Sequence, residues 1–107
     1  MVEDAIITAV RRYLAALPSR GIHPTRGVLF GSFARGPVHA WSDIDLIVIA
    51  PEFDGPRSLS LVEALWLATA SADDRIEPIP CSEQEWENDP GRPILEIARQ
   101  EGLVIAA

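Results

Sequence analysis

The segment that most constrains this chain is the apolar run from Asp43 to Ala50, which reads DIDLIVIA. Side chains alternate between the two faces of a strand, so Asp43 and Asp45 share one face with Ile47 and Ile49. Beyond Asp45 both faces are apolar, which is typical of a central strand covered on two sides. The segment therefore predicts a buried strand with two carboxylates at its polar beginning.

A second short strand is predicted over residues 26–30, and it ends at Gly31-Ser32. Glycine permits close backbone approach or a positive φ, and Ser32 offers a hydroxyl and an N–H at the start of a helical turn, where a phosphate can bind. Arg35 would lie on the same side of that turn and could pair with a phosphate. The two aspartates downstream have Cα atoms roughly 6.5–7 Å apart and can hold one divalent cation or share two. Together the segments predict metal-assisted phosphoryl chemistry.

The rest of the chain predicts the following elements: helices over 3–17, 60–70 and 93–101, a short helix from Ser82 to before Asp89, and strands over 75–80 and 103–106. Capping-box spacing at Ser60-Leu61-Val62-Glu63 and Ser82-Glu83-Gln84-Glu85 marks two helix starts. Gly102 marks the end of the last helix. No internal repeat or linker interrupts this order, so we expect a single domain over residues 1–107.

The strand over 75–80 contains two prolines, Pro78 and Pro80. Because they lie two residues apart, both remove backbone donors from the same edge of the strand. The strand can therefore pair fully on one side only, and it should lie at a sheet edge or beside an irregular gap.

The helix predicted over 60–70 is apolar almost all round, with Glu63 and Thr69 as its polar exceptions. One face should meet the sheet. Two alternatives remain open for the other face: burial within the fold, or contact with a second copy or another partner.

Composition narrows the possible settings of the protein. The chain has 107 residues and a net charge of −7, and its nine basic residues are all arginine, so no basic footprint for nucleic acid is visible. No apolar run is long enough to span a membrane, and Glu3 and Asp4 stand where a secretion signal would be basic. Cys81 is the only cysteine, so no internal disulfide can form. We therefore expect a cytoplasmic protein.

The string Gly31-Ser32-Phe33-Ala34-Arg35-Gly36, followed by Ser42-Asp43-Ile44-Asp45-Leu46, resembles the signature of the DNA polymerase beta-like nucleotidyltransferase superfamily. It is especially similar to the minimal nucleotidyltransferases, many of which are encoded beside a HEPN-type protein as toxin–antitoxin pairs. The close motif match covers residues 28–50. The expected order of helices and strands is compatible over the whole chain.

The resemblance implies an α/β (α+β) fold, with a small mixed sheet and helices packed mainly on one face. It also implies transfer of a nucleoside monophosphate from a nucleoside triphosphate, expected to be ATP, to a hydroxyl, with release of pyrophosphate. Minimal members lack the extra helical domain of larger relatives. The acceptor is then expected on another protein, such as a cognate HEPN toxin, or across an oligomer interface.

Residue by residue, the resemblance implies that Gly31 and Ser32 hold the triphosphate and that Asp43 and Asp45 bind Mg²⁺, as part of a two-metal site. The family usually has a third acid on a neighbouring strand. Glu77 is the candidate, since it is the only acid inside the strand over 75–80.

Two departures from the family pattern affect the expected site. Many minimal members have aspartate at the third acidic position, where this chain offers Glu77 between prolines. The chain also has no lysine, so the phosphate charge must be met by metal and by Arg35, with Arg26 or Arg75 as further candidates.

Other functions also fit parts of the sequence. The apolar helix over 60–70 suits an antitoxin that neutralises its partner by binding, with little or no catalysis. A haloacid-dehalogenase-like phosphatase also uses Asp-x-Asp, but there the acids follow the strand and no Gly-Ser turn is needed. A transferase acting on a small molecule stays open, although such enzymes usually need more chain for the acceptor.

Overall fold

The computed structural model describes residues 4–31, 43–88 and 92–107. Its helices are α1 (Asp4–Ala16), α3 (Leu59–Leu67), α4 (Glu83–Asn88) and α5 (Pro93–Glu101). Its strands are β1 (Arg26–Phe30), β2 (Ile44–Ile49), β3 (Ile76–Cys81) and β4 (Leu103–Ala106). Three short 3-10 helices are η1 (Pro18–Arg20), η2 (Pro51–Phe53) and η3 (Ala68–Ser71). Each predicted helix and strand within the described ranges is present.

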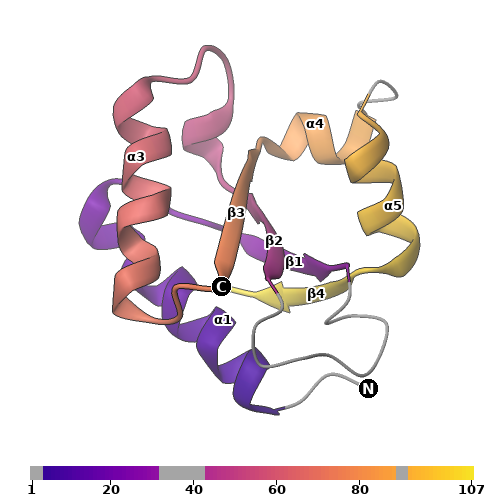
Figure 1. Ribbon diagram of the computed structural model, residues 1–107. Coiled ribbons are helices and arrows are strands. Elements are labelled where there is room, and N and C mark those ends of the chain that lie inside the picture. Colours follow the sequence, from indigo (N-terminus) through magenta and orange to yellow (C-terminus); the bar gives the residue numbers. More distant parts are fainter. Residues whose placement is uncertain (1–3, 32–42, 89–91) are drawn as a thin grey trace.

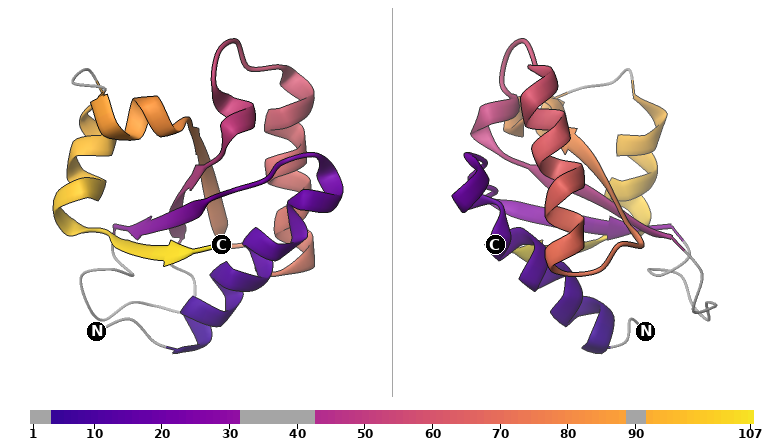
Figure 2. Two further views of the ribbon diagram at one scale, coloured as in Figure 1. Left: turned by 180° about the vertical axis from the view of Figure 1, so that it is seen from behind. Right: turned by 60° about the vertical axis from the view of Figure 1, so that its left-hand side comes forward.

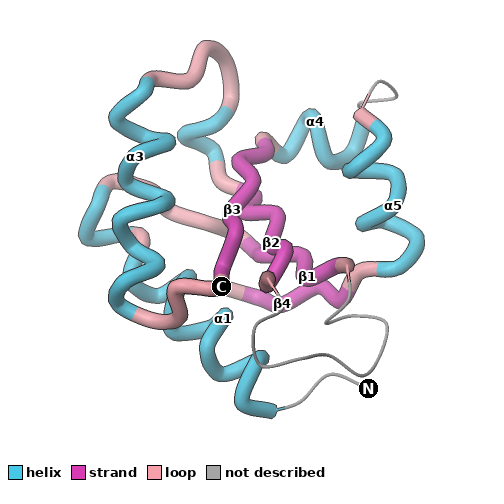
Figure 3. Tube along the Cα trace, viewed as in Figure 1, coloured by secondary structure: helices cyan, strands magenta, loops and turns pink. Residues whose placement is uncertain are grey.

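The strands form one mixed sheet in the order β3-β2-β1-β4, as Figure 3 shows. β2 is parallel to β3, whereas β1 is antiparallel to both β2 and β4. The prediction of a small mixed sheet is confirmed, and β2 lies inside it as expected.

Both faces of β2 are buried, and each face contributes to a different hydrophobic cluster. Leu46 and Val48 belong to the larger cluster, with residues of α1 and α3. Ile47 and Ile49 belong to a smaller cluster that includes Leu95 of α5. Figures 1 and 2 show α1 and α3 on one side of the sheet and the short helices α4 and α5 on the other. The larger core agrees with helices packed mainly on one face, but the second face is covered as well.

α1 and α3 are joined by a buried hydrogen bond. Tyr13 of α1 donates its hydroxyl to the carbonyl oxygen of Leu65 in α3, at 2.7 Å. Burial raises the pKa of the Tyr13 hydroxyl, so this group stays a donor at physiological pH. The bond fixes the two helices beside each other on one face of the sheet.

The two predicted capping boxes have different outcomes. Ser82 and Glu85 form the expected reciprocal pair: Glu85 N–H donates to Ser82 Oγ, and Ser82 N–H donates to Glu85 Oε1, each at 3.1 Å. The prediction that Ser60 caps α3 is wrong, because α3 begins at Leu59. Ser58 is extended and accepts a hydrogen bond from Leu61 N–H, so Ser60 lies inside the first turn.

Gly102 follows α5 as predicted, but for a different reason. Its φ is −80°, which any residue can adopt, so no left-handed conformation is needed. A Cβ at this position would instead lie 2.6 Å from Val28 Cγ1 and would overlap the carbonyl oxygen of Ala98. Glycine is required here for space.

β3 is the outermost strand on its side of the sheet, as its prolines predicted. Hydrogen bonds at the two ends of β3 show which edge of the strand faces β2. The carbonyl oxygen of Arg75 accepts from the N–H of Ile44, and that of Cys81 accepts from the N–H of Ala50. Odd-numbered residues of this strand therefore face β2, and Pro78 and Pro80 face the outer edge. The N–H groups that these prolines lack would not face β2, so no hydrogen bond between β2 and β3 is lost.

The outward face of α3 is exposed rather than buried within the fold. Leu65 points inward and is fully buried, but Leu59, Trp66 and Leu67 are 72%, 49% and 59% exposed. No helix in the described ranges is long and apolar enough to cross a membrane.

Candidate active site

Three adjacent strands bring the candidate site residues together. The end of β1 and the beginnings of the parallel strands β2 and β3 lie at one end of the sheet (Figure 1). In the register of the sheet, Asp45 is paired with Phe30 of β1 on one side and with Glu77 of β3 on the other. Asp43 directly precedes β2. The predicted acids therefore lie at neighbouring positions, although their separation along the chain is large.

Gly31 directly follows β1, and its backbone packs against the side chain of Asp45. Its φ is +77°, in the left-handed region that favours glycine. A Cβ at this position would overlap Asp45 Oδ2. Glycine therefore serves both the turn and the close packing of the Asp45 carboxylate against the backbone.

The three carboxyl groups act on one another. Burial raises the pKa of Asp45, and the nearby charge of Asp43 raises it further. Burial likewise raises the pKa of Glu77. The charges of Asp43 and Asp45 and the hydrogen bonds that Glu77 shares with both groups raise this pKa further. Like charges held this closely favour protonation or a bound cation.

The donor chemistry of this cluster fits a hard divalent cation. Mg²⁺ prefers oxygen ligands and is usually held by one or two carboxylates together with substrate phosphates. The side chains as placed do not surround a common centre: no group of three or more His, Cys, Asp or Glu residues in the described part of the chain is arranged to hold a metal. Glu77 does share hydrogen bonds with both Asp43 and Asp45.

Comparison with known families gives a match to the nucleotidyltransferase domain over residues 10–89. The chain belongs to this family. The match includes β1, β2 and β3, and with them every described residue of the acidic cluster. Membership makes the chain a transferase and implies transfer of a nucleoside monophosphate from a nucleoside triphosphate. A search of curated proteins finds no match.

Some predicted site residues of the nucleotidyltransferase domain cannot be placed. Ser32 and Arg35, together with the predicted helical turn after Gly31, lie outside the described residues. Arg26 is at the far end of β1 from Gly31, where it donates to Glu83 at 2.9 Å. Its position is therefore wrong for a phosphate ligand at the acidic cluster.

Arg75 lies at the same end of the sheet as the acids, two residues before Glu77. Its guanidinium donates to both carboxylate oxygens of Asp73, with the shortest contact at 2.6 Å from Nη2 to Oδ2. These hydrogen bonds lower the pKa of Asp73. The pair lies directly before β3, the strand that carries Glu77.

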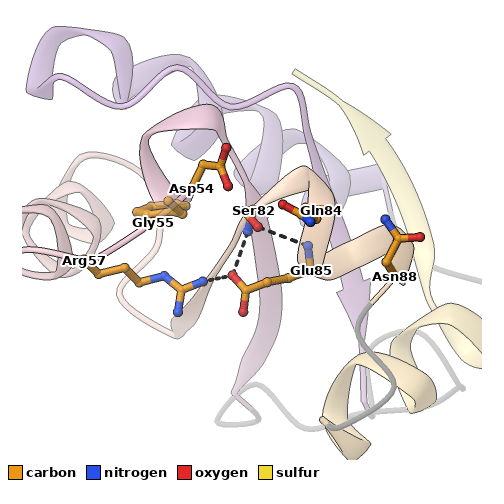
Figure 4. A pocket seen from close by; sticks show the side chains of 8 residues that line it. Asp54, Gly55, Arg57, Ser82, Gln84, Glu85 and Asn88 are labelled. Atoms are coloured by element: carbon orange, nitrogen blue, oxygen red, sulfur yellow. Dashed lines mark hydrogen bonds and ion pairs between the residues drawn. The ribbon is translucent and has the colours of Figure 1, made fainter.

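Sequence reasoning missed a second polar cluster in the nucleotidyltransferase domain. Arg57 donates to the carboxylate of Glu85 beside a cavity at the opposite end of β2 and β3 (Figure 4). Arg92 donates to the same carboxylate. The capping-box spacing identified Glu85, but no local signal joins it to arginines 28 positions before and 7 positions after it.

Proposed function

We propose that this domain transfers a nucleoside monophosphate from ATP to a hydroxyl group on a partner protein. The observation that carries the proposal is the placement of Asp43, Asp45 and Glu77 at the beginnings of two adjacent parallel strands, beside Gly31. A nucleotidyltransferase needs a cluster of this kind next to the turn that receives the triphosphate. The family match supports the reaction class.

In the proposed mechanism, Asp43, Asp45 and Glu77 would hold Mg²⁺, with two ions shared among them. Bound there, the metal would neutralise negative charge on the triphosphate and on the departing pyrophosphate. Gly31, Ser32 and Arg35 would receive the triphosphate.

Glu77 has a second proposed role. It lies beside Asp45 in the register of the sheet, at the position where an attacking hydroxyl would approach the metal site. It would take the proton from the attacking hydroxyl at its carboxylate oxygen, while Asp45, packed on Gly31, stays fixed in place.

The test is to incubate the protein with Mg²⁺, each of the four nucleoside triphosphates and the protein encoded beside it, and to measure intact masses. We expect the partner to gain one nucleoside monophosphate, most with ATP. Replacing both acids, Asp43→Asn with Asp45→Asn, should lower the rate by at least about 100-fold, since even groups that only orient metal ligands contribute 10–100-fold. The exposed Asp4→Asn variant is the matched control. Unchanged transfer by the double variant, or no added mass with any triphosphate, would refute the proposal.

The proposed partner is a HEPN-type toxin. The exposed apolar face of α3 supports a protein contact, since Leu59, Trp66 and Leu67 are uncovered there. A second copy of the chain could use the same face, and the mass of the complex distinguishes the two. The proposed setting is the cytoplasm, where the buried Cys81 thiol would stay reduced.

The same face of α3 also favours a second candidate function, neutralisation by binding alone. Under this alternative the Asp43→Asn, Asp45→Asn double variant still neutralises a toxin in a growth assay. Under the catalytic proposal it binds the toxin but fails to neutralise it. The two functions therefore predict opposite outcomes for one variant.

A further inference from the structure

Arg75 lies beside the acidic cluster of Asp43, Asp45 and Glu77. The register of β2 and β3 pairs Asp45 with Glu77. The hydrogen bond from Ile44 N–H to the carbonyl oxygen of Arg75, at 2.9 Å, extends this ladder by one step and places Arg75 next to Asp43. Alternate residues share a face, and neighbouring strands are about 4.8 Å apart, so a guanidinium at this position can reach the carboxylates of the cluster. Without another acceptor it would pair with them.

The guanidinium of Arg75 is directed at Asp73 instead. Its Nε donates to Asp73 Oδ1 at 3.0 Å and to Oδ2 at 3.3 Å, and its Nη2 donates to Oδ2 at 2.6 Å. Asp73 Oδ1 also accepts the backbone N–H of Arg75 at 2.9 Å, so the carboxylate is held beside this arginine from two directions. Among the residues that the structure describes, Arg75 forms its ion pair with Asp73 and with none of the three acids of the cluster.

A guanidinium among the three acids would compete with a metal ion for the same oxygen atoms. Arginine presents five N–H donors in a geometry that matches carboxylates, and it stays protonated at any physiological pH. Mg²⁺ needs carboxylate oxygens as ligands. A metal ion entering the cluster would therefore have to displace Arg75 from any carboxylate that it had paired with, and part of the binding free energy of the metal would be lost.

We propose that Asp73 is a positioning residue that holds Arg75 away from the acidic cluster and so keeps the three carboxylates open to a divalent metal ion. The inference rests on the proposed function, because it takes the cluster to be the metal site. Asp73 acts through Arg75, so the effect of replacing Asp73 on metal binding disappears when Arg75 is replaced as well. This dependence distinguishes the proposal from a general effect of Asp73 on the stability of the fold.

The test is a titration of the full chain with Mn²⁺ in the absence of nucleotide, followed by the electron paramagnetic resonance signal of free Mn²⁺. Mn²⁺ is suited to the same carboxylate ligands as Mg²⁺. Asp73→Asn keeps an acceptor for the Arg75 N–H but removes the charge that holds the guanidinium. It should weaken Mn²⁺ binding about tenfold, as expected for a residue that acts behind the metal ligands. The double variant Asp73→Asn with Arg75→Gln should bind Mn²⁺ like wild type, and Arg75→Gln alone should bind it at least as tightly.

Asp74→Asn is the matched control, because it removes the same charge at the exposed neighbouring position and should leave Mn²⁺ binding unchanged. The proposal is overturned if Asp73→Asn binds Mn²⁺ as tightly as wild type, if the double variant binds as weakly as Asp73→Asn, or if Arg75→Gln alone weakens binding. No Mn²⁺ binding by the wild type, or binding that survives Asp43→Asn with Asp45→Asn, would refute the metal site itself. The proposed function and this inference would then fail together, whereas the first three outcomes overturn the inference alone.

Discussion

The contact between Gly31 and Asp45 links the backbone turn to the acidic cluster. Gly31→Ala combines backbone strain at φ +77° with overlap between the new Cβ and Asp45 Oδ2. We expect a loss of at least about 1–2 kcal/mol in the free energy of unfolding, measured by urea denaturation, because left-handed backbone alone costs that much for alanine. Nucleotidyl transfer should also fall, because Asp45 must move.

Gly21 provides the control for this prediction. Its φ is +86°, but a Cβ there meets nothing within 4 Å. Gly21→Ala should therefore show the strain without the overlap, and it should keep full activity. If the two variants lose the same stability and the same activity, the packing of Asp45 on Gly31 is unimportant.

At the level of single residues, the sequence predicted the strand of each acid in the site, but not which residues lie next to it in the fold. Strand alternation placed Asp43 and Asp45 on one face, and the prolines placed Glu77 on an edge strand. The register that pairs Asp45 with Glu77 depends on long-range packing and has no local signal. The contact of Gly31 with Asp45 is likewise visible only in the folded chain.

An ion pair between Asp73 and Arg75 lies at the start of β3. Hydrogen bonds from Arg75 lower the pKa of Asp73, so the charged form is favoured in the native state. The stability from this pair is present above the ordinary aspartate pKa near 3.9 and is lost as pH falls through the lowered value.

Asp73→Asn should therefore lower the free energy of unfolding at pH 7 and flatten its decrease below about pH 4. Asp74→Asn, at the exposed neighbouring position, is the control. Urea denaturation between pH 2 and pH 7 measures both. Parallel pH profiles for the Asp73 variant and wild type would mean that the pair does not stabilise the fold.

The N-caps of α3 and α4 differ in how well the local sequence predicts them. Ser82→Ala should cost about 1 kcal/mol in the free energy of unfolding, since it removes the cap of α4. Ser60→Ala should cost little, because Ser58 supplies the cap of α3. Thermal or urea unfolding of both variants checks the difference, and equal losses would place the cap of α3 at Ser60 after all.

The spacing of Ser60 and Glu63 was indistinguishable in sequence from that of Ser82 and Glu85. Two serines compete for the start of α3, and the one that remains extended, Ser58, becomes the cap. Sequence pattern therefore predicted that both helices exist, but it could not choose between adjacent caps.

For the molecule as a whole, the exposed face of α3 is the clearest candidate for a protein contact. Between Ser58 and Ala72 the only charge is Glu63, in a chain of net charge −7. Leu67→Gln should change the free energy of unfolding by less than about 0.5 kcal/mol, because its side chain is 59% exposed. Association with a partner protein or a second copy should weaken at least about tenfold, if Leu67 is buried in the complex.

Size-exclusion chromatography with light scattering, and a binding titration against the partner, measure this effect. Ile97→Gln is the control, since Ile97 is 48% exposed on α5, across the sheet. Equal association of the two variants would exclude α3 as the contact. The sequence identified the apolar helix, but which of its faces meets the sheet depends on the packing of Leu65 and Tyr13.

The prolines of β3 have a further consequence for the whole sheet. An outermost strand usually offers a row of N–H and C=O groups to any extended chain that meets it, and such pairing leads to aggregation. Pro78 and Pro80 remove two of the donors that face outward. The strand that carries Glu77 is therefore a poor template for another strand. The outer edge of β3, beside the acids, can therefore stay open to a substrate without causing the protein to aggregate through strand pairing.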